Sequence, residues 1–181
     1  MVALEEKQHL LQAQDPRVRK RAFEGLVLEY QEVLYYHIRR IVIDHDDTDD
    51  VLQNTLLKAW RNLGKFRAES SIKTWMYRIA TNEALSFLKK KKRQGHEEIE
   101  DLQNDLRHSL HAERGPDGDE IQFKLQAAIL TLPDRQRMVF NMRYFQEMKY
   151  DEISEVLEVS VGALKASYHH AAKKIETYLT S

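Results

Sequence analysis

Residues 150–174 read YDEISEVLEVSVGALKASYHHAAKK, and they decide the fold of the second half of the chain. Apolar positions at helical spacing predict a short helix over 150–157 and a longer helix that begins at Val161. The residues 158–160 form a tight break, and Ser160 is a suitable N-cap for the longer helix. A short helix, a turn of three or four residues and a second helix are the layout of a helix-turn-helix.

The longer helix of this motif carries small, polar and basic side chains opposite its apolar stripe. Such a helix fits the major groove, where its first turns reach base edges and its lysines contact phosphates. An antiparallel helical hairpin with no role in DNA binding is the alternative that the pattern leaves open. The outer positions are Gly162, Ala163, Lys165, Ala166, Ser167, His169, His170, Lys173 and Lys174.

Three further helices are predicted in the first half of the chain. Apolar residues at steps of three and four indicate one long helix, or a closely joined pair, over 17–43. A second helix follows an acidic cluster and extends over 51–63, and a third begins after Ser70 or Ser71 and continues to a basic run at 89–93. The polar face of the third helix combines cations, an aromatic ring and amides: Lys73, Tyr77, Arg78, Thr81, Asn82, Ser86 and Lys89. This mixture is suited to phosphates and unstacked bases, although an ordinary solvated helix face has the same pattern.

The periodicity fails between residues 94 and 119, where glycine, proline and charged residues indicate a linker. Beyond it, a helix is predicted from Ile121 to about Leu132. Pro133 then suits the first position of a further helix that continues to about Met148. The chain is therefore expected to form two small helical units joined by a flexible linker, and the pattern leaves open whether the units stay apart.

The composition narrows the function classes. The 181 residues are 42% hydrophobic and 31% charged, and only six are glycine and three proline, which predicts an all-α fold. The absence of cysteine excludes disulfides, thiolate zinc sites and cysteine nucleophiles. No apolar run approaches the roughly 20 residues of a spanning helix, and the first residues lack the features of a signal peptide. We therefore expect a cytoplasmic protein without membrane insertion.

Charge is segregated along the chain, although the net charge is only -1. Five aspartates lie between residues 44 and 50, whereas residues 89–93 read KKKKR. One surface is then able to meet phosphates while another meets a basic protein partner. The plainer interpretation is that both runs are solvated helix ends.

Metal sites and enzyme motifs find little support in the sequence. The acidic cluster invites comparison with a calcium loop, but Asp49 stands where that loop needs glycine and Thr55 where it needs glutamate. The pairs His108 with His111 and His169 with His170 lack the further ligands of a zinc site. No phosphate-binding loop or nucleophile motif is present. We therefore expect no catalytic residue, no metal and no cofactor.

Two blocks of sequence resemble the extracytoplasmic-function sigma factors of bacterial RNA polymerase. The first block is DVLQNTLLKAW at 50–60 with FRAESSIKTWMYRIATN at 66–82, and the second joins LP at 132–133, YDEIS at 150–154 and VGALK at 161–165. The family carries only sigma regions two and four. The resemblance implies a region 2-like helical bundle over 1–93, a flexible linker over 94–119 and a region 4-like helix-turn-helix domain over 120–181.

The resemblance also implies a function and its partners. The chain would be a non-enzymatic subunit that binds core RNA polymerase, reads and melts promoter DNA and initiates transcription, and that an anti-sigma protein holds inactive. Implied residues are Asp50, Gln53, Asn54 and Lys58 for core polymerase; Phe66, Lys73, Trp75, Tyr77, Arg78 and Asn82 for the melted minus-ten element; and Ser160, Lys165, Ala166, Ser167, His169, His170 and Lys173 for the minus-thirty-five duplex.

Some positions depart from the family pattern. Asn54 stands where relatives often have glutamate, which puts one polymerase contact in doubt. Ala166, Ser167 and His170 stand where relatives often have serine and arginines, so direct arginine readout of guanine is not expected. The alternatives are a dimeric helix-turn-helix regulator that binds duplex operators without polymerase and a purely structural helical adaptor. The face with Asn82 argues against the regulator, since a protein that binds duplex operators has no need of a surface for single-stranded DNA.

Overall fold

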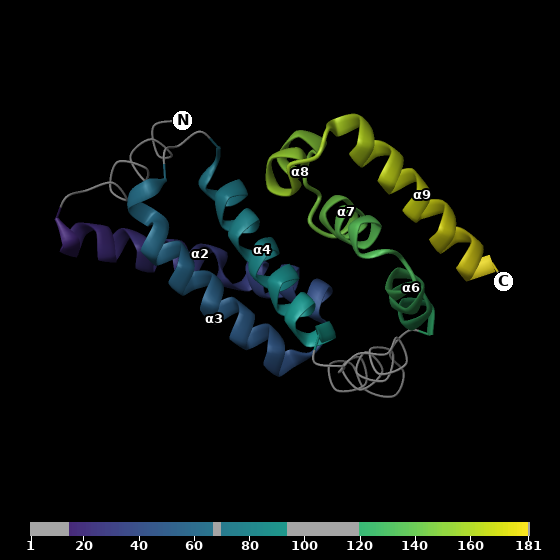
Figure 1. Ribbon diagram of the computed structural model, residues 1–181, viewed down its shortest axis with the longest axis horizontal. Coiled ribbons are helices and arrows are strands. Elements are labelled where there is room, and N and C mark those ends of the chain that lie inside the picture. Colours follow the sequence, from purple (N-terminus) through teal and green to yellow (C-terminus); the bar gives the residue numbers. More distant parts are fainter. Residues whose placement is uncertain (1–14, 67–69, 94–119, 181) are drawn as a thin grey trace.

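The computed structural model describes residues 15–66, 70–93 and 120–180, and within these ranges it contains helices and no strand (Figure 1). This confirms the predicted all-α fold class. None of the described helices is long and apolar enough to cross a membrane. The first unit consists of α2 (Pro16–Val42), α3 (His45–Asn62), the 3-10 helix η1 (Leu63–Lys65) and α4 (Ile72–Arg93); the second consists of α6 (Glu120–Leu130), α7 (Asp134–Tyr144), α8 (Tyr150–Leu157) and α9 (Val161–Thr180).

The sequence had suggested that the acidic cluster precedes the second helix. In the structure, all of the cluster except Asp44 lies within α3. Asp44 is the N-cap, and its carboxylate accepts a hydrogen bond from the Asp47 amide at 2.8 Å. The following aspartates occupy the first turns, where negative charge is stabilised by the positive end of the helix dipole. Much of this cluster therefore serves to start the helix.

The basic run forms the last turn of α4, and one of its lysines returns to the acidic cluster. Ser71 caps the start of the helix by accepting from the Thr74 amide at 3.0 Å, as predicted. At the other end, Lys91 Nζ lies 2.8 Å from the Asp47 carboxylate, and both side chains are largely buried. The two charged segments are therefore neighbours, whereas the sequence had suggested two separate surfaces.

Helix α7 is shorter than predicted, because it ends at Tyr144 and not near Met148. The chain turns at Glu147, whose φ is 52°, and the Met148 amide donates back to the Met142 carbonyl oxygen at 3.1 Å. This turn places the Met148 side chain in the core, where it is 1% exposed. Burial of one large apolar side chain thus outweighs continuation of the helix.

The helix-turn-helix has the predicted bounds, with α8 and α9 separated by residues 158–160. Glu158 adopts the left-handed conformation, with φ 55° and ψ 45°, which ends α8 sharply. Ser160 Oγ accepts from the Ala163 amide at 3.4 Å, which confirms the predicted N-cap of α9.

The two units pack against each other over a shared core (Figure 1). Helix α4 contacts α8, and α2 also contacts α7. The main cluster of buried apolar side chains takes Leu34 from α2, Met76 from α4, Met142 from α7 and Ile153 from α8. The sequence had left the relative placement of the units open, and here they form one body. The predicted linker, 94–119, lies outside the described residues.

Candidate nucleic-acid interface

Helix α9 presents the predicted duplex-reading residues on one exposed face. Its buried side chains are Leu164, Ala171 and Ile175, and the helix packs against α6, α7 and α8. The predicted residues Lys165, Ala166, His169, His170 and Lys173 are exposed, Ser167 is half-buried, and Ser160 is exposed at the start of the helix. The structure therefore brings these seven positions together, with small and basic side chains facing solvent.

Replacing Ser160 with alanine tests the N-cap of α9. The substitution removes the oxygen that accepts from the Ala163 amide, and the hydrogen bond is long, at 3.4 Å. We expect the free energy of unfolding to fall by about 0.5–1 kcal/mol, measured by urea denaturation. Ser86→Ala, at an exposed position inside α4, serves as the matched control and should not destabilise the chain. An equal loss in both variants would contradict the capping role.

The polar face predicted for α4 divides into an exposed edge and a buried strip. Asn82 is exposed and Lys73 and Arg78 are half-buried, whereas Tyr77 is 3% exposed and Thr81 is 1% exposed. The expectation that Tyr77 and Thr81 lie on a solvated face is therefore wrong for this arrangement. The second unit and a side chain from α2 cover them.

The covering side chain from α2 is His37, which is fully buried. Its ring centroid lies 4.9 Å from that of Tyr77, and its Nε2 lies 2.9 Å from Thr81 Oγ1. Its other nitrogen, Nδ1, lies 2.7 Å from the Gln146 amide nitrogen of the second unit. Burial lowers the pKa of His37 from 6.5 to about 3, so the imidazole is neutral at physiological pH.

Phe66 and Trp75, both predicted to contact melted DNA, pack together. Their ring centroids are 5.2 Å apart, and Phe66 is 4% exposed in a small cluster with Leu26 and Ile72. Trp75 is half-buried against the same cluster. In this arrangement Phe66 supports the start of α4 and is not open to solvent.

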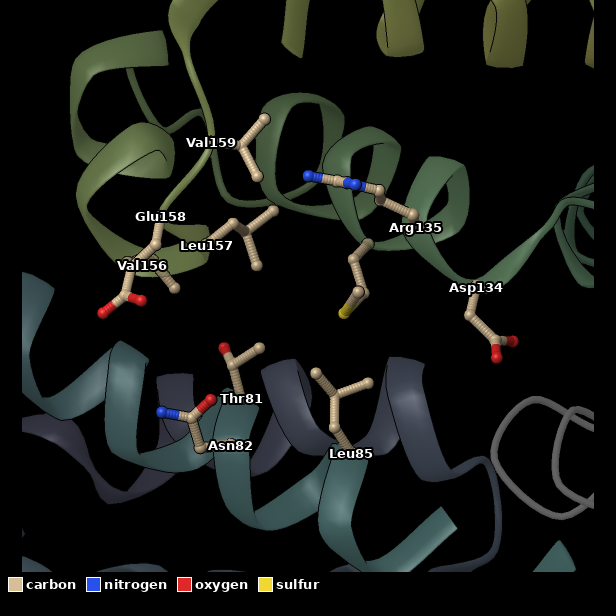
Figure 2. A pocket seen from close by; sticks show the side chains of 10 residues that line it. Thr81, Asn82, Leu85, Asp134, Arg135, Val156, Leu157, Glu158 and Val159 are labelled. Atoms are coloured by element: carbon tan, nitrogen blue, oxygen red, sulfur yellow. The ribbon is translucent and has the colours of Figure 1, made fainter. Parts of the chain in front are cut away.

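A cleft of about 310 Å³ separates α4 from α7 and α8 (Figure 2). Helix α4 contributes Thr81, Asn82 and Leu85, and Figure 2 shows Asn82 across the opening from Glu158. The Arg78 guanidinium lies 3.9 Å from the Glu158 carboxylate. Glu158 thus stands near the Arg78 and Asn82 side chains that were predicted to contact the minus-ten strand, and its negative charge opposes a phosphate there.

The residues predicted to bind core polymerase form the outer face of α3. Asp50, Gln53, Asn54 and Lys58 are all exposed, although Lys58 also pairs with Glu83 of α4. Leu57 lies on the same face, is 47% exposed and was missed by the sequence analysis. The exposure of Leu57 was predictable from the sequence, because Leu57 falls outside the apolar stripe that packs α3 inward.

Comparison with known proteins identifies both units. Residues 26–94 match the family Sigma-70 region 2, and residues 122–175 match Sigma-70, region 4. The RNA polymerase sigma-H factor of Pseudomonas aeruginosa is 33% identical over 99% of this chain and 96% of its own. The ECF RNA polymerase sigma-E factor of Haemophilus influenzae is 30% identical over 87% of each chain. The chain belongs to the extracytoplasmic-function sigma factors.

This sigma factor acts with RNA polymerase in transcription initiation, and the dimeric-regulator alternative is not favoured. Sigma factors are in general regulatory subunits without enzymatic activity. Two solved structures share the fold. The sigma factor RpoE from Bartonella quintana, solved with the anti-sigma factor NepR, has a TM-score of 0.70 at 22% identity and covers 87% of this chain and 96% of its own. CnrH, solved with the cytosolic domain of CnrY, has the same score and identity and covers 98% and 97%.

Metal-ligand geometry is not seen within residues 15–66, 70–93 and 120–180, where no three histidine, aspartate or glutamate side chains gather as ligands. In the acidic cluster, Asp44 caps α3, Asp47 pairs with Lys91, and Asp49 lies 3.9 Å from His45. His108 and His111 lie outside the described residues. These three carboxylates of the cluster thus have partners within the chain.

Proposed function

We propose that the sigma factor divides its work among three surfaces. The outer face of α3 docks on core RNA polymerase, the edge of α4 captures the melted minus-ten strand, and the outer face of α9 reads the minus-thirty-five duplex. The corresponding units are residues 1–93 and 120–181, with a linker at 94–119. The chain itself supplies no catalytic group, metal or cofactor and works in the cytoplasm.

The observation that carries this proposal is the outer face of α9. Leu164, Ala171 and Ile175 are turned inward, so small and basic side chains project together from the opposite face of this helix of 20 residues. Ala163 and Ala166 permit close approach to base edges, while Lys165 and Lys173 reach toward the backbone. The histidines between them supply ring nitrogens that donate to or accept from base edges.

The face of α3 supports a protein partner. Asp50, Gln53 and Asn54 offer a carboxylate and two amides next to the exposed Leu57, a mixture found at protein interfaces with an apolar centre and a polar rim. The relatives RpoE and CnrH were solved with NepR and with the cytosolic domain of CnrY. We propose that an anti-sigma protein likewise binds this chain.

Run-off transcription with purified core polymerase and genomic DNA fragments tests the proposal. Start sites should appear only when the sigma factor is present. Asn82→Ala removes the exposed amide at the edge of α4, and we expect about tenfold less open complex, since a lost base contact costs about 1–3 kcal/mol. Permanganate reactivity of unpaired thymines measures the opening directly.

Gln31→Ala, which removes an exposed side-chain amide from α2, is the control and should open promoters as the wild type does. If the protein shifts duplex DNA by itself while no core-dependent transcript appears, the division of work proposed above is wrong and the regulator interpretation replaces it.

A further inference from the structure

The contact between the two units contains an unusual set of polar groups. On one turn of α2, the Arg40 carbonyl oxygen accepts from Asn141 Nδ2 at 3.3 Å, and the Arg40 guanidinium lies 4.6 Å from the Phe145 ring centroid. On the same turn, His37 Nδ1 lies 2.7 Å from Gln146 Nε2. The end of α7 and the residues after it therefore dock on α2 through named polar atoms as well as through the apolar core.

Three buried polar atoms at this contact have no hydrogen-bond partner among the residues that the structure describes. They are Asn141 Oδ1, Gln146 Oε1 and Arg78 Nε, and each belongs to a residue that contacts the other unit. A buried polar group without a partner is unfavourable, because it has lost water and gained nothing in return. Interfaces between domains that separate are typically more polar than permanent ones. Water would satisfy these atoms once the units part.

The hydrogen bonds around His37 indicate which ring nitrogen of the neutral imidazole carries the proton. The Thr81 hydroxyl donates to the Tyr77 carbonyl oxygen at 2.7 Å, so its oxygen accepts from His37 Nε2–H. His37 Nδ1 then accepts from the Gln146 amide. The neutral imidazole is satisfied on both sides, and burial, more than the Gln146 amide, disfavours the charged ring.

We propose that His37 and Gln146 form a latch that holds the sigma factor closed over Tyr77 and Thr81, and that this latch opens before α4 takes up the melted strand. The closed form is the packed arrangement of the two units. The inference rests on the proposed role of α4 in binding the minus-ten strand. It follows from burial of the centre of that face by His37 of α2, which Gln146 of the second unit contacts, and by packing of α8 on α4.

The surroundings of His37 make the latch sensitive to protons. Arg40 faces it from its own helix, Tyr77 from α4 and the uncharged Gln146 from the second unit, while Glu152 of α8 acts on Tyr77. Burial raises the pKa of Tyr77, which stays neutral, and Arg40 opposes a charge on His37.

The direction of the pH effect follows from the two states of His37. Its pKa is about 3 in the closed form and returns toward the ordinary 6.5 when the units separate. The closed form is therefore fully favoured above pH 6.5. Between pH 6.5 and pH 3, the ratio of closed to open molecules falls by up to about tenfold per pH unit, because opening takes up one proton.

Fluorescence energy transfer on the full chain tests the latch without DNA or polymerase. The chain has no cysteine, so Lys65→Cys in the first unit and Glu176→Cys in the second provide the only thiols for a donor and an acceptor dye. We expect Gln146→Ala to lower the ratio of closed to open molecules about tenfold at pH 7.5. We expect the ratio of closed to open molecules of the wild type to fall about tenfold between pH 7.5 and pH 5.5.

Two further variants keep the test specific. Glu155→Ala, at an exposed position on α8, should leave energy transfer unchanged, and His37→Gln, which takes up no proton, should lose the pH response. Circular dichroism confirms that each variant stays helical. Energy transfer unaffected by both Gln146→Ala and acid would overturn the latch.

Binding of a single-stranded minus-ten oligonucleotide separates the latch from the proposed function. With the latch opened by Gln146→Ala, affinity should rise about tenfold over the wild type. If Gln146→Ala opens the chain but its affinity equals that of the wild type, the latch does not guard this face and the proposal is overturned. If neither protein binds any oligonucleotide while energy transfer responds as expected, the role of α4 fails and the hydrogen-bonded closure of the units stands.

Discussion

Leu34→Ala is expected to lower the free energy of unfolding by about 2–5 kcal/mol. Leu34 has no exposed surface and belongs to the core cluster that α2 shares with α4, α7 and α8. Truncation removes buried methyl groups and leaves a cavity that helices held from several sides fill only in part. Urea denaturation followed by circular dichroism at 222 nm measures the loss.

The control for this prediction lies on the same helix. Leu28 is 75% exposed, so Leu28→Ala changes the residue type identically without opening a cavity. Its effect should stay within about 0.5 kcal/mol, as for most surface substitutions. Equal losses in the two variants would mean that Leu34 is not packed as described.

The paired substitution Lys165→Ala and Lys173→Ala is expected to weaken binding of the minus-thirty-five duplex about 10–100-fold at about 0.1 M salt. Both lysines are exposed on the outer face of α9, one near its start and one further along. Each phosphate contact that is lost also lowers the slope of log affinity against log salt by about one, so the pair should lower it by about two. Fluorescence anisotropy with a labelled duplex at several salt concentrations gives both quantities.

Lys20→Ala with Lys65→Ala is the matched control, because it removes the same charge from exposed positions of the first unit. This pair should leave the affinity and the salt slope close to those of the wild type. If it reduces both as strongly as the α9 pair does, attraction to DNA comes from overall charge and the outer face of α9 has no special part in it.

The fold was largely predictable where the signals are local. The bounds of α8 and the start of α9 follow from apolar spacing and from Ser160, whose hydroxyl caps the helix within three residues. The same reasoning failed at the end of α7, because the turn there brings Met148 into a core made by distant helices. Helix periodicity describes which side of a helix is apolar, but it does not report how much burial a turn gains.

The candidate site divides in the same way. The exposed polar residues predicted on α9 and α3 were identified because a surface helix keeps its polar face outward in any arrangement, whereas the apolar Leu57 was missed. Tyr77 and Thr81 were misplaced, because their face meets a histidine from α2, and that histidine in turn contacts an amide of the second unit. A polar helix face that packs on another polar face has the same sequence pattern as a polar helix face exposed to water.

The sequence by itself determined most of the helix bounds, the helix-turn-helix, the family and the outer face of α9, since each depends on spacing within a few turns or on a motif that stays together in the chain. Only the tertiary structure decided that the two units share a core and that His37 meets Gln146, 109 positions along the chain. The physical reason is that such a contact depends on the shapes and hydrogen-bonding groups of two complete surfaces. Neither surface exists before the helices have packed.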